Sequence, residues 1–372
     1  MFNTNPLIRL VLGLALLGAA TARAQHEPTD APPETGHLEL TFDERHPDSD
    51  IETLLARFRF RGNPNDAPDP RVHATEYNLE GQTFQAYIPD AYDGSEPFGL
   101  LVWVAADDRG EIPWPEVFDN RRLIVVSADG VGDRQNIWKR MGLQLDAVHN
   151  MTARYHIDPQ RVYISGCSKG GRIASQLGLV FADVFDGAMP MDGCDWYQQI
   201  EVPGQDNVYY RSRFRRPAHR LLRIAKSQNR YVLMTGEHDE NRGQTQAFFE
   251  LGYERAGFEH VWYLEEEGVT HCRHSAAFVE RGLALLDQPL EDGTIEPESE
   301  DNAEADDESG RDRPAREPRT PRVETAAQLL NLARNYLDAG LNERAKEKLE
   351  TLLELYPESD EAPIAQELLN AL

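Results

Sequence analysis

The sequence predicts an α/β fold, with helices on both faces of a mostly parallel sheet, followed by an acidic linker and a small all-α helical-repeat module. Apolar runs typical of strands alternate with runs of helical periodicity between Gly99 and Leu286, and joining them by right-handed crossovers gives a parallel sheet. With 372 residues, 40% of them hydrophobic, the chain has room for one large domain and a small one.

Residues 1–24 read as a signal peptide. Arg9 precedes the apolar run Leu10–Ala20, and Ala22-Arg23-Ala24 has the pattern of a cleavage site. The apolar run is too short to span a bilayer; an uncleaved anchor is the alternative. We therefore expect a secreted or periplasmic protein that has no membrane association after cleavage, with a disordered leader over residues 25–36.

The main domain is expected over residues 37–288. A strand at Leu38–Phe42 and a short helix at Asp50–Phe58 open it. Further strands are expected at Tyr77–Leu79 and Thr83–Ile88, paired as a hairpin, and at Gly99–Ala105, Leu123–Ser127, Arg161–Ser165, Asp186–Met191, Tyr231–Thr235 and His260–Leu264. Helices are expected at Trp138–Tyr155, Gly171–Phe185, Arg242–Ala256 and Ser275–Leu286.

The connection Gln198–Asn229 is longer than two neighbouring strands require, so it can form a cap over a site. Its Tyr210 and Arg213 are candidate substrate-binding residues, since arginine pairs with anionic groups. Surface arginines on a loop are the alternative interpretation.

The C-terminal part divides into a disordered linker over residues 289–322, acidic and then Pro/Arg-rich, and a helical module over residues 323–372. In the module the spacing of small and apolar residues resembles one tetratricopeptide unit; they are Leu329, Leu332, Ala333, Tyr336, Gly340, Ala345, Leu349 and Pro357. One such unit cannot bury its own apolar face, so we expect a protein partner or self-association through this module. An ordinary helical hairpin is the alternative.

The charge argues against a nucleic-acid partner, because the formal net charge is −26 and binding to phosphate backbones depends on clustered Lys and Arg. No pattern indicates a metal site or an organic cofactor. The three cysteines are Cys167, Cys194 and Cys272, and in an oxidising compartment we expect one pair and one free thiol.

The segment Gly166–Gly171 reads as a nucleophile elbow. It follows the strand-like run Val162–Ser165 and precedes a helical run, so Ser168 would stand at a sharp strand-to-helix turn. A serine hydroxyl held there is open to a base and to backbone N–H groups. Together with the predicted sheet, this motif indicates the α/β-hydrolase layout, a three-layer sandwich.

In this layout the base lies on the loop after the last strand, and the acid comes before the base in the chain. His271 has the expected place for the base, with His274 and His238 as rivals. Asp239, after the strand Tyr231–Thr235, is the predicted acid. The remaining candidates for the acid are Glu237, Glu240, Asp192 and Asp195.

An oxyanion hole is expected from two backbone N–H groups, one on Lys169 and one near Ala106 in the loop after Val102–Val104. The chain has no His-Gly-Gly run there.

The span from Tyr77 to Leu286 resembles secreted esterases of the polyhydroxybutyrate depolymerase and feruloyl or acetylxylan esterase type. The residues that carry this resemblance are Asp158–Ser168 and the turn Gly236–Asp239. The elbow Gly-Cys-Ser-Lys-Gly-Gly-Arg is also similar to that of glucuronoyl esterases. That resemblance implies a disulfide between Cys167 and Cys272; bonding of His271 to Ser168 would bring the same two cysteines close, and Cys194 is the competing partner for Cys167.

These features predict an exported serine esterase, with Ser168 as nucleophile, that acts through an acyl-enzyme on a small or polymeric carboxylic ester, such as a polyester or an esterified glycan side group. A serine peptidase would use the same residues. The alternative from another class is a catalytically silent scaffold that presents the helical module.

Overall fold

The computed structural model describes residues 33–288, 326, 329–330, 333–334, 337, 342–357, 359 and 361–372. The predicted signal peptide, most of the predicted leader and the predicted linker lie outside these residues.

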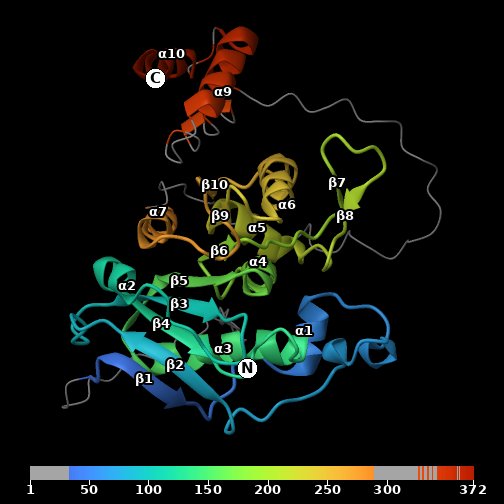
Figure 1. The fold of residues 1–372 in the computed structure, drawn as a ribbon, viewed down its shortest axis with the longest axis vertical. Coiled ribbons are helices and arrows are strands. Elements are labelled where there is room, and N and C mark those ends of the chain that lie inside the picture. The colour runs from blue at the N-terminus through green and yellow to red at the C-terminus, as the bar shows by residue number, and fades with distance from the viewer. Residues whose placement is uncertain are drawn as a thin grey trace, which may run out of the picture.

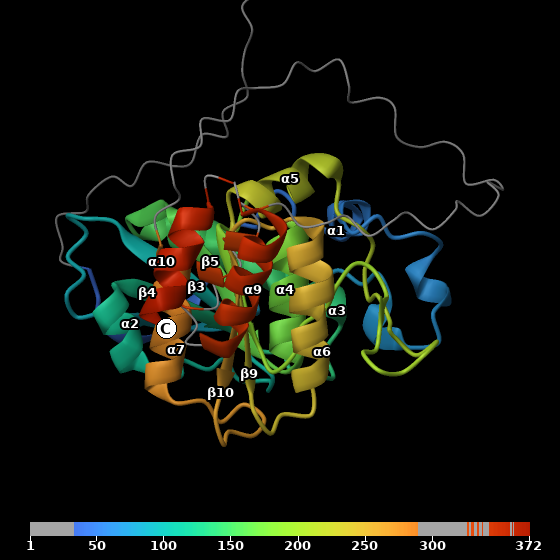
Figure 2. The same cartoon turned by 90° about the horizontal axis from the view of Figure 1, so that it is seen from above.

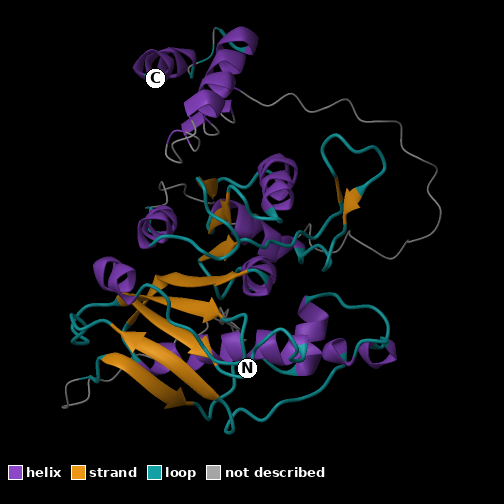
Figure 3. Cartoon of the chain, in the orientation of Figure 1, coloured by secondary structure: helices purple, strands orange, loops and turns teal. Residues whose placement is uncertain are grey.

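An eight-stranded sheet forms the centre of the main domain (Figures 1 and 3). Its order is β1-β2-β4-β3-β5-β6-β9-β10, antiparallel at β1, β2 and β4 and parallel from β4 to β10. The strands are β1 (Gly36–Thr41), β2 (Thr83–Ile88), β3 (Phe98–Val104), β4 (Leu123–Ala128), β5 (Ile157–Cys167), β6 (Gly187–Met191), β9 (Arg230–Gly236) and β10 (Val261–Glu266). With helices on both faces, this is the α/β-hydrolase fold.

The helices of the domain include one π-helix and two short 3₁₀ helices. They are α1 (Ile51–Arg57), η1 (Pro64–Asp66), η2 (Pro70–Val72), α2 (Pro115–Arg121), α3 (Ile137–Arg154), α4 (Lys169–Val180), α5 (His219–Ser227), α6 (Arg242–Ala247), the π-helix η3 (Phe248–Glu254) and α7 (Ala276–Leu286). A two-stranded ribbon, β7 (Ile200–Glu201) with β8 (Tyr209–Tyr210), lies in the connection after β6.

Two apolar layers enclose the sheet because the central strands are buried on both faces. Every residue of β3 and of β4 is buried, as expected for strands covered on both sides. Along β3, Leu100 and Val102 face a core shared with α1, α3 and α4, whereas Leu101 and Trp103 face a core shared with α2 and α7. Figure 2 shows α3 and α4 on one side of the sheet and α2 and α7 on the other.

The predicted hairpin between Tyr77–Leu79 and Thr83–Ile88 is wrong. Residues 77–79 form no strand; instead the Tyr77 hydroxyl donates a hydrogen bond to Asp146 on α3. The antiparallel partner of β2 is β1, with Thr41 opposite Thr83 and Gly36 opposite Ile88. The segment around Tyr77 therefore packs on a helix, while the distant strand β1 extends the sheet.

The predicted helix Arg242–Ala256 is present as α6 followed directly by η3. The helices α2 and α5 and the β7–β8 ribbon were not expected from the sequence.

At the C-terminus, α9 (Asn342–Leu355) packs against α10 (Ala362–Ala371). Leu349 and Leu352 share an apolar cluster with Ala362 and Ala365, which also includes Leu329 and Ala333. Leu332, Tyr336 and Gly340 lie outside the described residues, so the tetratricopeptide assignment stays a prediction. None of the helices that the structure describes has the length and apolar character needed to cross a membrane.

Candidate active site

Ser168 stands at a sharp turn between β5 and α4, with φ 57° and ψ −118°. A non-glycine residue at positive φ is strained and needs surroundings that hold it there. Those surroundings are tight: a Cβ on Gly170 would lie 2.1 Å from the Val104 carbonyl oxygen, and one on Gly193 would lie 2.2 Å from the Ser168 carbonyl oxygen. The Ser168 N–H also donates to the Met191 carbonyl at 2.8 Å. Glycines thus let β3 and the loop after β6 clamp the elbow.

The two backbone N–H groups that the sequence predicts for an oxyanion hole belong to segments next to the elbow. The Lys169 N–H is at the first position of α4, where no helical acceptor is available. Ala106 follows β3 by two residues, close to where Val104 contacts Gly170, and among the described residues its N–H has no hydrogen-bond partner. Asp133 links these two segments: its carboxylate accepts from Lys169 Nζ at 2.6 Å, and its N–H donates to the Ala106 carbonyl at 3.1 Å.

His271 lies in the loop between β10 and α7 and donates from Nδ1 to a carboxylate oxygen of Asp239. The Asp239 side chain is fully buried, whereas that of His271 is 39% exposed. A buried carboxylate on Nδ1 fixes the tautomer that leaves Nε2 able to accept a proton. Within the described residues, neither Nε2 of His271 nor the Ser168 hydroxyl has a hydrogen-bond partner. The structure therefore pairs His271 with Asp239 but shows no hydrogen bond from His271 to Ser168.

A disulfide joins Cys167 to Cys272, with their Cα atoms 5.9 Å apart. Cys167 directly precedes Ser168, and Cys272 directly follows His271. The bond therefore ties the elbow to the loop that carries the imidazole. Cys194, the competing partner, is a buried free thiol whose pKa is raised by burial to about 12.

A second carboxylate–imidazole pair holds the same loop from inside. Asp192 accepts hydrogen bonds from the Cys272 N–H at 2.5 Å, from His274 Nε2 at 2.9 Å and from the Gly236 N–H at 3.0 Å. His274 Nδ1 donates to Glu266 at 2.9 Å, so both ring nitrogens carry protons.

Burial alone would lower the pKa of His274, but hydrogen bonds to Asp192 and Glu266 outweigh burial and raise it. For Asp192, burial opposes ionisation, but the hydrogen bond from His274 leads the contributions that lower its pKa. This pair is ionic and fully enclosed, which suits support of the loop rather than proton transfer to a substrate.

The other candidates for the acid and the base lie elsewhere. Glu237 accepts from the Gly268 N–H at 2.8 Å, and Glu240 is exposed. Asp195 forms a salt bridge with Arg172 at 2.8 Å. The side chain of His238 is exposed, and its Nε2 lies 3.9 Å from a carboxylate oxygen of Glu237.

Arg172, one turn after the elbow on α4, is a site residue whose role the sequence reasoning did not recognise. Besides Asp195, its guanidinium donates to Asn241 at 3.0 Å and to Gln244 at 2.7 Å. Asn241 in turn donates to the Asp192 carbonyl at 3.0 Å. Arg172 thereby connects α4 to the segment that carries Asp239, and no local sequence signal indicates those partners.

Asp192, Asp239 and His271 each have one side-chain atom of a kind that can bind a metal ion, and these three atoms lie within 4.8 Å of one another. In the structure Asp239 bonds His271 and Asp192 bonds His274. These carboxylates therefore form two neighbouring carboxylate–imidazole pairs.

Of the two predicted substrate-binding residues, Arg213 lines a cavity and Tyr210 does not. Arg213 is exposed and lines a cavity beside the helix α4. Tyr210 lies in β8, with its ring 5.8 Å from that of Phe248; it does not line that cavity.

Comparison with known proteins gives partial similarities. No family model matches the chain. Poly(3-hydroxyalkanoate) depolymerase C of Paucimonas lemoignei is 44% identical over 46 residues, which are 12% of this chain and 11% of that protein. The match thus spans about a tenth of the length of that relative.

Several solved structures resemble part of the chain. Esterase 2 of Thermogutta terrifontis phosphonylated by sarin is 17% identical with a TM-score of 0.41, covering 57% of this chain and 90% of that one. Est1E of Butyrivibrio proteoclasticus is 15% identical with a TM-score of 0.39, covering 56% and 93%. A mutant feruloyl esterase module of Clostridium thermocellum is 15% identical with a TM-score of 0.39, covering 55% and 81%. The fold assignment rests on the strand order and connections of this chain.

Proposed function

We propose that this protein is an exported serine hydrolase of carboxylic esters. The observation that carries the proposal is the tethering of Ser168 to the His271–Asp239 pair, through the disulfide between the residue before the serine and the residue after the histidine. A strained serine, an imidazole oriented by a buried carboxylate, and unpaired N–H groups beside the serine are the parts that acyl transfer needs.

In the proposed mechanism, Ser168 Oγ attacks the ester carbonyl carbon while His271 Nε2 takes the hydroxyl proton. The carbonyl oxygen becomes an oxyanion, and the N–H groups of Lys169 and Ala106 stabilise it. Collapse of the tetrahedral intermediate breaks the bond to the alcohol oxygen, which receives the proton from His271. Water then attacks the acyl-enzyme, with His271 again taking a proton, and the carboxylic acid and free serine are regenerated. Asp239 orients the imidazole and stabilises its cationic form throughout.

Polymeric or glycan-linked esters are the proposed substrates. The short match to a poly(3-hydroxyalkanoate) depolymerase and the resemblance of part of the fold to an enzyme described as a feruloyl esterase are consistent with this class. The disulfide supports export, because such bonds persist mainly outside reducing compartments.

Hydrolysis of a short-chain aryl ester by purified wild-type protein and by Ser168→Ala tests the proposal. We expect turnover by the wild type and a loss of at least about 1000-fold in Ser168→Ala with unchanged circular dichroism. A wild type inert towards aryl esters, esterified glycans and a fluorophosphonate probe would favour the silent scaffold. Cleavage of peptides but not of unactivated esters would favour a peptidase.

A further inference from the structure

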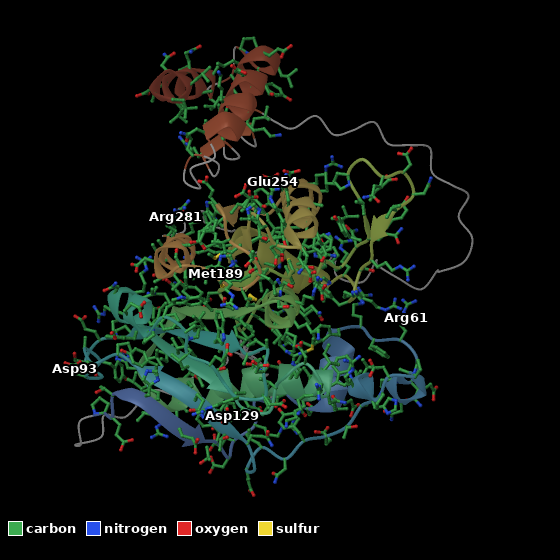
Figure 4. The ribbon with its side chains drawn as sticks, in the orientation of Figure 1. Arg61, Asp93, Asp129, Met189, Glu254 and Arg281 are labelled. Atoms are coloured by element: carbon green, nitrogen blue, oxygen red, sulfur yellow. A yellow bond between two sulfur atoms is a disulfide. The ribbon has the colours of Figure 1, made fainter. Side chains whose placement is uncertain are left out.

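A cavity of about 690 Å³ lies against α3 and α4, between two segments far apart in the sequence. One wall comes from the residues that follow α1, and the other from the segment between β8 and α5. Arg61, labelled in Figure 4, belongs to the first wall. The volume is within the range of small-molecule sites. Ser168, Lys169 and His271 do not line it, so it is separate from the candidate active site.

The cavity is strongly basic on a chain whose net charge is −26. Five arginines and no acidic residues line it; the arginines are Arg59, Arg61, Arg213, Arg215 and Arg216. Among the described residues, Arg59, Arg213, Arg215 and Arg216 form no ion pair with an acidic group. The buried carboxylate of Asp195 interacts electrostatically with Arg213, but the lining itself carries only positive charges. Like charges gathered in this way attract a ligand that carries more than one anionic group.

Aromatic rings also line the cavity: Phe60 and Phe214 belong to the arginine-bearing segments, and Trp138 belongs to α3. Trp138, Tyr197 and Phe214 are almost fully buried, whereas Phe60 is 41% exposed. The Phe60 and Trp138 rings meet edge to face, 5.7 Å apart. The exposed part of the Phe60 ring can pack against a ring face of a ligand. Guanidinium groups on both segments suit anionic groups spaced along that ligand.

We propose that this cavity binds an acidic oligosaccharide, a chain of sugar rings bearing carboxylate or sulfate groups. Guanidinium groups spread over two segments, with the exposed Phe60 ring beside them, fit anions repeated along a chain better than the single compact anion of a phosphate site.

The helix α4 connects the cavity to Ser168. Gln176 lines the cavity and follows Ser168 by eight residues, which is about 12 Å along a helix. A chain of a few sugar rings spans that distance, so the cavity can hold an acidic glycan while an ester on the same chain reaches the serine. This anchoring role rests on the proposed function; binding itself does not.

Titration calorimetry at low salt with the Ser168→Ala variant of the full chain tests binding apart from catalysis. The probes are a galacturonic acid hexamer, a sulfated hexasaccharide and neutral xylohexaose. We expect one or both acidic hexamers to bind, the neutral one to bind at least tenfold more weakly, and the affinity to fall as salt rises. The carboxylate and sulfate arms identify which anion the cavity takes.

The added double variant Arg213→Ala/Arg215→Ala should weaken acidic binding at least tenfold. Its matched control is Arg223→Ala/Arg255→Ala, which removes the same charge from exposed positions outside the cavity, and should leave binding unchanged. Equal losses in the two double variants, equal binding of the neutral hexamer, or no binding of either acidic hexamer would overturn the proposal. These outcomes are independent of ester turnover, so failure of the proposed function is seen separately.

Discussion

Removal of the Cys167–Cys272 disulfide, in the double variant Cys167→Ala/Cys272→Ala, should strongly lower the free energy of unfolding. The bridge joins residues separated by 105 positions. For a loop of that length, the chain-entropy model gives about 4.8 kcal/mol of stabilisation at 25 °C, as an upper value. This is a large share of the 5–15 kcal/mol typical of natural domains. Guanidinium denaturation followed by circular dichroism, at neutral pH and without reductant, measures the difference.

Cys194→Ala is the control, because it removes the buried free thiol and keeps the bridge; it should cost less than about 2 kcal/mol. Turnover of an aryl ester by the double variant should also fall, since the loop of His271 loses its covalent link to the elbow. A double variant within about 1 kcal/mol of the wild type would refute the view that this bond restrains the chain.

Three further predictions concern the elbow and its supporting loop. Asp239→Asn should lower kcat for an aryl ester by about 10⁴-fold at pH 7, because the amide no longer fixes the reactive tautomer of His271; a loss below tenfold would exclude Asp239 as the acid. Gly193→Ala should cost about 100-fold in kcat/KM, because its Cβ would lie 2.2 Å from the Ser168 carbonyl oxygen and displace the nucleophile; unchanged kinetics would contradict the tight packing. His274→Gln should lower stability most near pH 5.5. The raised pKa of His274 makes its contribution complete below the ordinary histidine value, and the contribution is lost as pH rises through the raised value. The lowered pKa of Asp192 makes its own contribution fail as pH falls through that value. Denaturation midpoints of wild type and variant at pH 5.5 and 9.5 should therefore converge at the higher pH, and a gap that widens there would contradict the ionic pair.

Local sequence patterns were sufficient to predict those features that depend on residues close together in the chain. The strand-to-helix turn at Ser168 follows from two glycines and the runs on either side, and most strands of the parallel sheet follow from continuous apolar segments. Chain order, together with positions directly after predicted strands, pointed to His271 and Asp239, and the structure brings these two residues into hydrogen-bond contact.

The features that the sequence did not predict depend on contacts between residues far apart in the chain. The β1–β2 pair joins segments about forty residues apart, and Tyr77–Leu79 has a strand-like composition but bonds to a helix. Asp192 was only one of several possible acids until its partner His274, 82 positions away, was seen. Arg213 was a candidate substrate-binding residue of the predicted cap, but the sequence did not indicate that the segment after α1 supplies the other wall of the basic cavity.

The most direct test of the proposed nucleophile is covalent labelling with a fluorophosphonate, followed by mass spectrometry of the proteolytic peptides. We predict one adduct per chain on Ser168, formed by the folded wild type, absent from Ser168→Ala and strongly slowed in His271→Ala. A folded wild type that stays unlabelled, or that carries the adduct on another residue, would contradict Ser168 as the nucleophile.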